Sequence, residues 1–317
     1  MSRLPSSILA QFSIRYGILV SLTRLKPSFL LGYVTYCYRI CKIDSSSSRS
    51  EPLHHRISLF SPESLKALLL VLRFTSFTPW IYHSYPSVTI SLYADDTGIV
   101  AHDADYDTAV AKLQSAVDSV AKWAKKWKIR INESKSVRVD FSLRPHAHDP
   151  TILDGSAVPV ANSARYLGLH LDNKLNWSEH IRQKRVILDL LRFKFNWLLY
   201  SRQLSLHNKR LIYTSIFRPA WSYGAEIWGV AAASNIAVLE RFQNKFLRSI
   251  ARAPWFISNE QLQNELDIEP VQSVIMKRAT RYVSRLHQHP NTEAIQLLDD
   301  TNDTTRLQRK KLSNLLL

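Results

Sequence analysis

The sequence predicts an α+β fold in which an antiparallel sheet with a packed helix is followed by an all-helical region. Two strand-like runs, Val88–Leu92 and Thr97–Ala101, flank a short turn and indicate a β-hairpin. A long amphipathic stretch then runs from Tyr106 to Trp127. From Trp177 onward helical patterns predominate, so the sheet is expected before that residue.

The composition favours a folded, basic protein with a polyanionic partner. The chain has 317 residues, of which 45% are hydrophobic, and a formal net charge of +16. The apolar share is enough for a core and excludes global disorder, and the charge favours nucleic acid over a membrane as the partner. A basic solvated surface without a specific partner is the alternative. Cys37 and Cys41 cannot by themselves form a disulfide framework or a four-ligand zinc site.

The apolar segment Ile8–Cys41 is not expected to cross a membrane. Arg15, Arg24, Lys26 and Pro27 interrupt it before a run of about 18 uncharged residues is reached. We expect no signal peptide either, because no compact apolar stretch ends in a small-residue cleavage site. The sequence therefore predicts a soluble protein of the nucleus or the cytoplasm.

Changes in sequence character predict four segments. Residues 1–87 carry ten Lys and Arg against three acidic residues and show no sustained amphipathic period. We therefore expect this segment to be divergent and poorly ordered. The predicted boundaries are 1–87, then 88–175 for the sheet with its helix, 176–290 for the helical region and 291–317 for a polar, then basic, tail.

Four consecutive residues, Tyr93-Ala94-Asp95-Asp96, lie at the turn of the predicted hairpin. Two adjacent carboxylates at a strand end are typical of a two-metal site for phosphoryl or nucleotidyl transfer. Carboxylate oxygens suit Mg²⁺, which binds through one or two carboxylates together with substrate phosphates. The alternative is a surface turn, since Asp is a common turn residue.

Regular elements follow the hairpin in order. Asp103 or Asp105 is expected to cap the amphipathic helix, whose apolar stripe should lie on the sheet as a core face. An alternating strand is predicted at residues 137–141. A polar loop follows with His146 and His148, which we interpret as exposed residues and not as metal ligands.

Strand and helix patterns continue after this loop. The run Arg165–Asp172 alternates as a strand, in which Gly168 permits a kink or a close backbone approach. Ser178 is expected to cap a helix that runs to about Tyr200, and Ser205 to start a second helix that is interrupted or bent at Pro219.

A third helix is predicted from a cap at Ser234 to a point before Pro254. Cations spaced by four, three and four residues form a stripe on it. A stripe of this kind can follow a phosphate backbone, and a merely solvated face is the alternative. The residues of this basic stripe are Arg241, Lys245, Arg248 and Arg252.

The order of these features resembles the C-terminal part of a reverse transcriptase from a non-LTR retrotransposon of the jockey type. The resemblance runs from about Val88 to Val271. It rests on four segments, in this order: S-L-Y-A-D-D-T-G-I-V, W-A-K-K-W-K-I-R-I-N-E-S-K-S, A-R-Y-L-G-L-H-L-D-N-K-L-N-W and L-I-Y-T-S-I-F-R-P-A-W-S-Y-G-A-E-I-W-G. The first resembles the catalytic hairpin of the polymerase palm, and the third resembles the primer-grip hairpin that leads into a helical thumb.

The resemblance implies an RNA-directed DNA polymerase that uses Mg²⁺, with Mn²⁺ as an alternative, on an RNA template, a DNA primer and deoxynucleoside triphosphates. It implies that Asp95 is a direct metal ligand and Asp96 its less essential neighbour. Tyr93 would then contact the primer end, Lys135 would lie near the triphosphate, and Gly168 would belong to the primer grip. The chain would be a partial palm followed by an all-helical thumb and C-terminal region.

The resemblance also has gaps upstream of the hairpin. The family needs another carboxylate from an earlier palm strand, and neither Asp44, Glu51 nor Glu63 is placed to provide it. The fingers domain and a P-Q-G-x motif are missing, and Ser61–Leu72 stands where that motif is expected. Our hypothesis is that the N-terminal segment is read in a shifted frame or is host-derived. We expect a reverse transcriptase fragment that is inactive by itself, the alternative being a non-catalytic nucleic-acid-binding remnant, and we leave its oligomeric state open.

Overall fold

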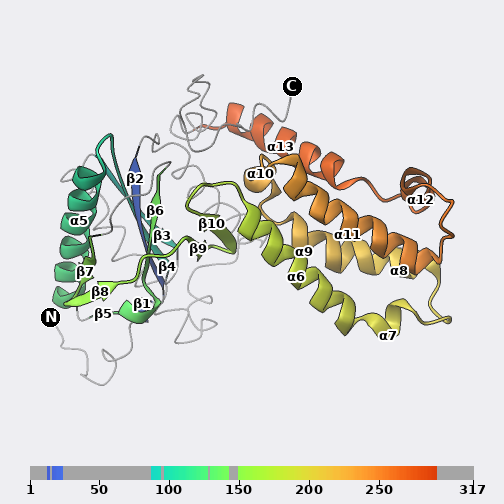
Figure 1. Ribbon diagram of the computed structural model, residues 1–317, viewed down its shortest axis with the longest axis horizontal. Coiled ribbons are helices and arrows are strands. Elements are labelled where there is room, and N and C mark those ends of the chain that lie inside the picture. The colour runs from blue at the N-terminus through green and yellow to red at the C-terminus, as the bar shows by residue number, and fades with distance from the viewer. Residues whose placement is uncertain are drawn as a thin grey trace, which may run out of the picture. The chain divides into compact units, whose positions relative to one another are not determined.

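The computed structural model describes residues 13–14, 16–23, 87–93, 96–127, 129–142 and 149–290. The described chain divides into two compact units, one that ends at Gly168 and one that begins at Leu169 (Figure 1). The first unit contains a four-stranded sheet, and the second is helical apart from one short strand. The division lies slightly upstream of the boundary at residue 175 that the sequence predicts.

The main sheet of the first unit has the strand order β3-β4-β2-β6. β3 (Val88–Tyr93) and β4 (Asp96–Asp103) pair antiparallel, as the hairpin prediction requires. β2 (Tyr16–Thr23) lies between β4 and β6 (Val137–Phe141) and runs parallel to both. The sheet is therefore mixed, and within it only the hairpin of β3 and β4 is antiparallel as predicted.

β2 comes from the N-terminal segment, for which the sequence analysis predicts no strand. Its sequence, Y-G-I-L-V-S-L-T, does not alternate between apolar and polar residues. Near-continuous apolar runs of this kind are typical of a strand in the middle of a parallel arrangement, so a search for alternation does not detect them. β1 (Ser13–Ile14) also comes from this segment and pairs in parallel with β5 (Arg130–Ile131).

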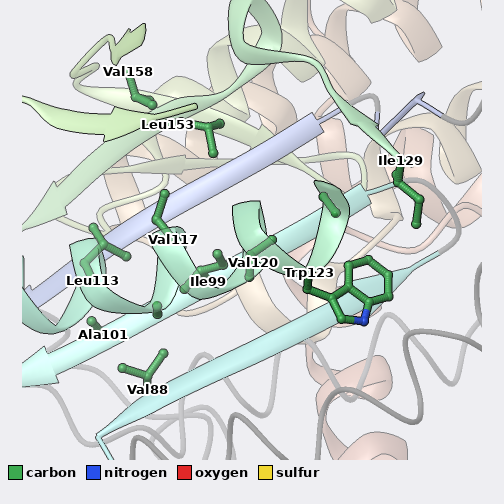
Figure 2. Close-up of a cluster of buried hydrophobic side chains, with 12 residues drawn as sticks. Val88, Ile99, Ala101, Leu113, Val117, Val120, Trp123, Ile129, Leu153 and Val158 are labelled. Carbon is green, nitrogen blue, oxygen red and sulfur yellow. The ribbon is translucent and has the colours of Figure 1, made fainter. Parts of the chain in front are cut away.

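Helix α5 (Tyr106–Lys126) covers the sheet with the predicted apolar stripe. Asp105 is its N-cap, because a carboxylate oxygen of Asp105 accepts a hydrogen bond from the Thr108 N–H at 3.0 Å. Figure 2 shows the helix residues of this core facing the strands. The buried cluster consists of Val88, Ile99, Ala101, Leu113, Ala116, Val117, Val120, Trp123, Ala124, Ile129, Leu153 and Val158.

Short elements complete the first unit. The turn η3 (Glu133–Lys135) precedes β6, and β7 (Thr151–Leu153) and β8 (Ser156–Val158) form a small antiparallel hairpin beyond it. His146 and His148 lie outside the described residues. β9 (Ser163–Tyr166) is the last strand of the unit.

A buried arginine joins three of these elements. Arg138 on β6 is fully buried and donates hydrogen bonds to both carboxylate oxygens of Asp140, at 2.7 and 3.1 Å. It also donates to the Tyr106 hydroxyl at the start of α5 (2.7 Å) and to Thr151 Oγ1 on β7 (3.0 Å). The Tyr106 hydroxyl in turn donates to Asp140 at 2.9 Å. Burial and the neighbouring Asp140 raise the pKa of Tyr106 to about 12, so this hydroxyl remains a donor at neutral pH.

The sequence predicts the run Arg165–Asp172 as one strand in which Gly168 permits a kink or a close backbone approach. This run consists of two strands joined by a tight turn. β9 ends at Tyr166, and β10 (Leu169–Asp172) begins three residues later. Leu167 and Gly168 between them have φ values of 46° and 81°. Two consecutive residues with positive φ are characteristic of a two-residue hairpin turn, which reverses the chain instead of kinking it.

The second unit contains the predicted helices with some shifted ends. Helix α6 (Ser178–Lys194) begins after Trp177 and continues into α7 (Asn196–Leu199). Ser205 caps α8 (Leu206–Ile212) as predicted, and a π-helical turn, Tyr213–Phe217, connects it to α9 (Arg218–Ser222). Pro219 lies in the first turn of α9, directly after the π-helical turn, and it lacks the N–H that would bond to that turn.

The remaining helices pack around an aromatic core. α10 (Ala225–Trp228) is short, and α11 (Ala233–Ala251) begins after Ala232 and not after the predicted Ser234. α12 (Asn259–Glu265) and α13 (Val271–His287) follow (Figure 1). Buried rings from the π-helical turn and α11 contact one another, with centroids 4.6–6.3 Å apart. They are those of Tyr213, Phe217, Phe242 and Phe246.

Candidate active site

The candidate site is the turn between β3 and β4. Tyr93 is the last residue of β3 and pairs across the hairpin with Asp96, the first residue of β4. Ala94 and Asp95 connect the two strands and lie outside the described residues. The Asp96 side chain is half-buried. The register therefore puts Asp96 at the first position of β4, opposite the last residue of β3.

A hydroxyl pair beneath this turn holds the hairpin to β9. Ser91 on β3 is buried, and its hydroxyl donates to the Gly98 carbonyl at 3.2 Å. The Tyr166 hydroxyl lies 3.0 Å from Ser91 Oγ and donates to it, because the hydrogen of Ser91 is already used. A Cβ at Gly98 would lie only 2.5 Å from Ser91 Oγ, so glycine is required by space at this position. Sequence reasoning missed Ser91 and Tyr166, which carry no signal without the fold.

The strand next to Asp96 provides no carboxylate. In the register of β2 with β4, Tyr16 lies opposite Asp96, and no residue of Tyr16–Thr23 is Asp or Glu. Within the part of the chain that the structure describes, no three His, Cys, Asp or Glu side chains gather as a metal site would require. The hairpin aspartates are ligands of the type that Mg²⁺ prefers, but the donor set lacks a third carboxylate on the neighbouring strand.

Lys135 lies at the same end of the main sheet as Asp96. Parallel strands begin at the same edge of a sheet, and β2, β4 and β6 are parallel. Asp96 begins β4, and Lys135 ends the turn η3 two residues before Val137 begins β6. The Lys135 side chain is exposed. The topology thus brings this predicted nucleotide-binding residue to the edge that carries the hairpin turn.

Gly168 forms the turn after β9 with a φ of 81°, a conformation that glycine adopts without strain. This turn conformation explains why glycine occupies position 168. A contact with the primer stays a prediction.

The four residues of the basic stripe on α11 differ in their surroundings. Arg241 and Lys245 are exposed. Arg248 donates to the carbonyls of Pro254 and Ile257, each at 2.8 Å, and so holds the loop after the helix. Arg252 ends α11 with a φ of 52°. The stripe therefore combines two solvent-facing cations with two that also have structural roles.

Comparisons with known proteins identify the first part of the chain. Residues 68–171 match the family model described as reverse transcriptase (RNA-dependent DNA polymerase). This match begins upstream of Val88, where the sequence analysis placed the start of the resemblance. No solved structure matches the chain significantly. Among the described residues, no helix is long and apolar enough to cross a membrane.

Curated relatives cover most of this chain. A probable RNA-directed DNA polymerase from transposon X-element of Drosophila melanogaster is 35% identical over 243 residues, which are 74% of this chain and 27% of the relative. The RNA-directed DNA polymerases from mobile element jockey of Drosophila melanogaster and of Drosophila funebris are each 32% identical, over 70% and 66% of this chain and 25% and 23% of the relatives. The chain thus spans about a quarter of the length of these relatives.

The family match contains the whole hairpin, the helix packed on it and the strands that follow. The similarity to the polymerases of jockey-type elements continues over most of the chain. The matched residues 68–171 therefore belong to the reverse transcriptase (RNA-dependent DNA polymerase) family.

Proposed function

We propose that this chain is the part of an RNA-directed DNA polymerase that carries the catalytic hairpin and a helical thumb. The observation that supports it most is the tetrad Tyr93-Ala94-Asp95-Asp96, at the turn of a β-hairpin within the residues that match the family. The substrates would be an RNA template, a DNA primer and deoxynucleoside triphosphates. In this proposal residues 88–175 form a partial palm, and residues 176–290 form the thumb and C-terminal region.

Each residue at the sheet edge has a proposed role. Asp95 and Asp96 hold the divalent cation, Tyr93 contacts the primer end, Lys135 neutralises triphosphate charge and Gly168 belongs to the primer grip. Bound Mg²⁺, or Mn²⁺ in its place, supplies charge neutralisation at the transferred phosphoryl group and lowers the pKa of the primer hydroxyl. The aspartates orient the reacting groups by holding this charge at one point of the hairpin.

The missing carboxylate leads us to propose that the polypeptide does not polymerise by itself. One adjacent aspartate pair offers too few ligands for two ions. β2 fills the position beside β4 but carries no acidic residue. Among the described residues, the strand beside the hairpin therefore offers no third carboxylate ligand.

A chimera tests this proposal directly. Residues 1–67, which precede the family match, would be replaced by the corresponding region of the jockey polymerase. We expect labelled nucleotide to be incorporated on a primed RNA template in the presence of Mg²⁺ by the chimera but not by the original chain. Asp95→Ala should abolish this incorporation, whereas Asp118→Ala, which changes an exposed carboxylate on α5, should not.

Two results would contradict the proposal. Activity of the original chain that depends on Asp95 would show that the third carboxylate is not missing. A folded chimera that binds primed template without extending it would show that this hairpin is not a competent catalytic element.

A non-catalytic nucleic-acid-binding protein is the second candidate function. It is favoured by the absence of a carboxylate on β2 and by the exposed cations Arg241 and Lys245. In this case affinity for primed template should fall steeply with added salt and should not change in the Asp95→Ala and Asp96→Ala variants. Affinity that needs Mg²⁺ and both aspartates would exclude this candidate.

For the N-terminal segment we propose a change of reading frame or a host-derived origin. The proposal rests on the basic composition of residues 1–87 and the missing P-Q-G-x motif. Because the family match reaches back to residue 68, we place the junction before that residue. Translation of the coding DNA for residues 1–67 in the other two frames tests the frameshift. If neither frame yields a P-Q-G-like motif, the frameshift is excluded.

A further inference from the structure

The turn after α11 displays two aromatic side chains in solvent. Trp255 and Phe256 are 89% and 68% exposed, and Trp255 is the most exposed large apolar side chain among the described residues. Their rings lie edge to face, with centroids 6.0 Å apart and an interplanar angle of 83°. Aromatic side chains normally contribute large buried areas to a core, so two adjacent rings left in water need an explanation.

This turn is held in place by hydrogen bonds. The Ile257 N–H donates to the Pro254 carbonyl at 3.3 Å, which closes a β-turn with Trp255 and Phe256 at its centre. Arg248 donates hydrogen bonds to the carbonyls of Pro254 and Ile257. Its Nη2 also donates to Asn259 Oδ1 at 3.0 Å. The exposed rings are therefore presented by a braced turn.

A capping box continues this support on the far side of the turn. Ser258 accepts a hydrogen bond from the Gln261 N–H at 3.1 Å, and the Gln261 side chain accepts one from the Ser258 N–H at 3.0 Å. Both ends of the turn are thus anchored in helices, α11 before it and α12 after it.

A third exposed aromatic side chain belongs to the same end of the helical unit. Arg252, at the end of α11, donates a long hydrogen bond of 3.5 Å to the Tyr200 carbonyl just after α7. Trp197 on α7 is 75% exposed. Figure 1 shows the ends of α7 and α11 at this end of the helical unit. Arg252 thus connects the helix that carries Trp197 with the helix that leads to Trp255.

The helical unit that carries these rings has an excess of positive charge. Residues 169–290 contain eighteen Lys and Arg against nine Asp and Glu. Arg241 and Lys245 are exposed on α11, and Arg252 is exposed directly after it. Glu260 is exposed in the first turn of α12. Exposed aromatic rings beside an excess of cations are the combination that binds single-stranded nucleic acid, in which bases stack on rings and phosphates neutralise the cations.

We propose that Trp255, Phe256, Trp197 and Arg252 form a binding surface for single-stranded nucleic acid. The unpaired bases stack on the aromatic rings, and Arg252 contacts the phosphate backbone. This surface belongs to the helical unit and needs no chemistry at the hairpin aspartates. It shares only the class of partner, nucleic acid, with the proposed polymerase function.

Binding of a labelled oligothymidylate of about 16 nucleotides to the full chain, followed by fluorescence anisotropy, tests this proposal. The second probe is an abasic strand with the same number of phosphates. We expect the Trp255→Ala/Phe256→Ala variant to bind oligothymidylate about tenfold more weakly or worse, because stacking on both rings is lost. The abasic strand should bind the original chain more weakly than oligothymidylate does, and the double substitution should not change its affinity.

Three further variants sharpen the test. Leu190→Ala changes a side chain on α6 that is 63% exposed, and it should leave oligothymidylate affinity unchanged within about twofold. Arg248→Ala keeps both rings but removes the brace of the turn, and should cause an intermediate loss. Asp95→Ala should have no effect, which separates this surface from the proposed polymerase site.

Circular dichroism must first show that the variants retain helical structure. The proposal is wrong if the folded double variant binds oligothymidylate as the original chain does, or if the abasic strand binds as tightly as oligothymidylate. A double variant that instead loses binding to vesicles of phosphatidylcholine and phosphatidylserine, with unchanged affinity for oligothymidylate, would assign the turn to a membrane surface and also overturn the proposal.

Discussion

Gly98→Ala probes how the hairpin with the paired aspartates is held in the sheet. Gly98 on β4 lies directly opposite Ser91 on β3. A Cβ at residue 98 would lie 2.5 Å from Ser91 Oγ and 3.4 Å from Cζ of Tyr166. The first distance is too short for any real contact, so the Ser91 hydroxyl has to rotate away. This movement breaks its hydrogen bonds to the Gly98 carbonyl and the Tyr166 hydroxyl.

The expected cost follows from these contacts. Two buried hydrogen bonds contribute about 1 kcal/mol each. Overpacking at a buried position adds about 1–3 kcal/mol. Ala is favoured over Gly inside a strand by about 0.5–1 kcal/mol, which offsets part of the loss. We therefore expect Gly98→Ala to lower the free energy of unfolding of the first unit by about 2–4 kcal/mol.

Hydrogen–deuterium exchange of the α5 amides measures this free energy, because α5 packs on the sheet in the core of the unit. The matched background is Ser91→Ala, which removes the hydroxyl that collides with the new methyl group. In that background we expect Gly98→Ala to cost less than about 1 kcal/mol. Equal costs of Gly98→Ala in the two backgrounds would refute the steric argument.

The remaining predictions concern two buried groups, one in each unit. Arg138→Met leaves the Asp140 carboxylate buried without its cation and should destabilise the first unit by about 3–5 kcal/mol in the same exchange measurement. Burial, then the charges of Lys184 and His170, lower the pKa of His180 from 6.5 to about 3. The unfolded chain therefore binds a proton at His180 more readily than the folded chain does. The contribution of neutral His180 to the free energy of unfolding is fully present above pH 6.5 and is lost as the pH falls toward 3, with about 2 kcal/mol lost at pH 5. Urea unfolding of the second unit at pH 7 and pH 5 measures this loss, and His180→Leu should reduce it.

Controls separate these effects from general destabilisation. Lys125 pairs with Asp154 at 2.6 Å, and its side chain is 71% exposed, so Lys125→Met should cost less than about 1 kcal/mol. If Arg138→Met also lowered the free energy of unfolding by less than about 1 kcal/mol, the buried network of Arg138 and Asp140 would not stabilise the first unit as argued. For His180, a pH dependence of stability that is the same in the original chain and in His180→Leu would show that another group is responsible.

The hairpin and the helix packed on it could be predicted because their signals are local. The turn tetrad lies between two short apolar runs, and the Asp105 cap with the spacing of the α5 stripe specifies a helix without reference to the rest of the chain. The helical second unit was predicted for the same reason. Helix ends were less certain: Trp177 and Ala232, not Ser178 and Ser234, precede α6 and α11, because tertiary packing outweighs a local capping preference.

The sequence by itself determined the resemblance to reverse transcriptases, the tetrad with its paired carboxylates and the excess of basic charge, because these depend on residue identity and spacing. Only the tertiary structure decided which strand lies beside Asp96, since the pairing of β2 with β4 joins segments far apart in the chain. It also decided that Ser91 and Tyr166 support the hairpin and that Arg248 braces the turn that exposes Trp255. Such contacts have no sequence period. They arise when folding brings distant polar groups into a buried or crowded place, where each must find a partner.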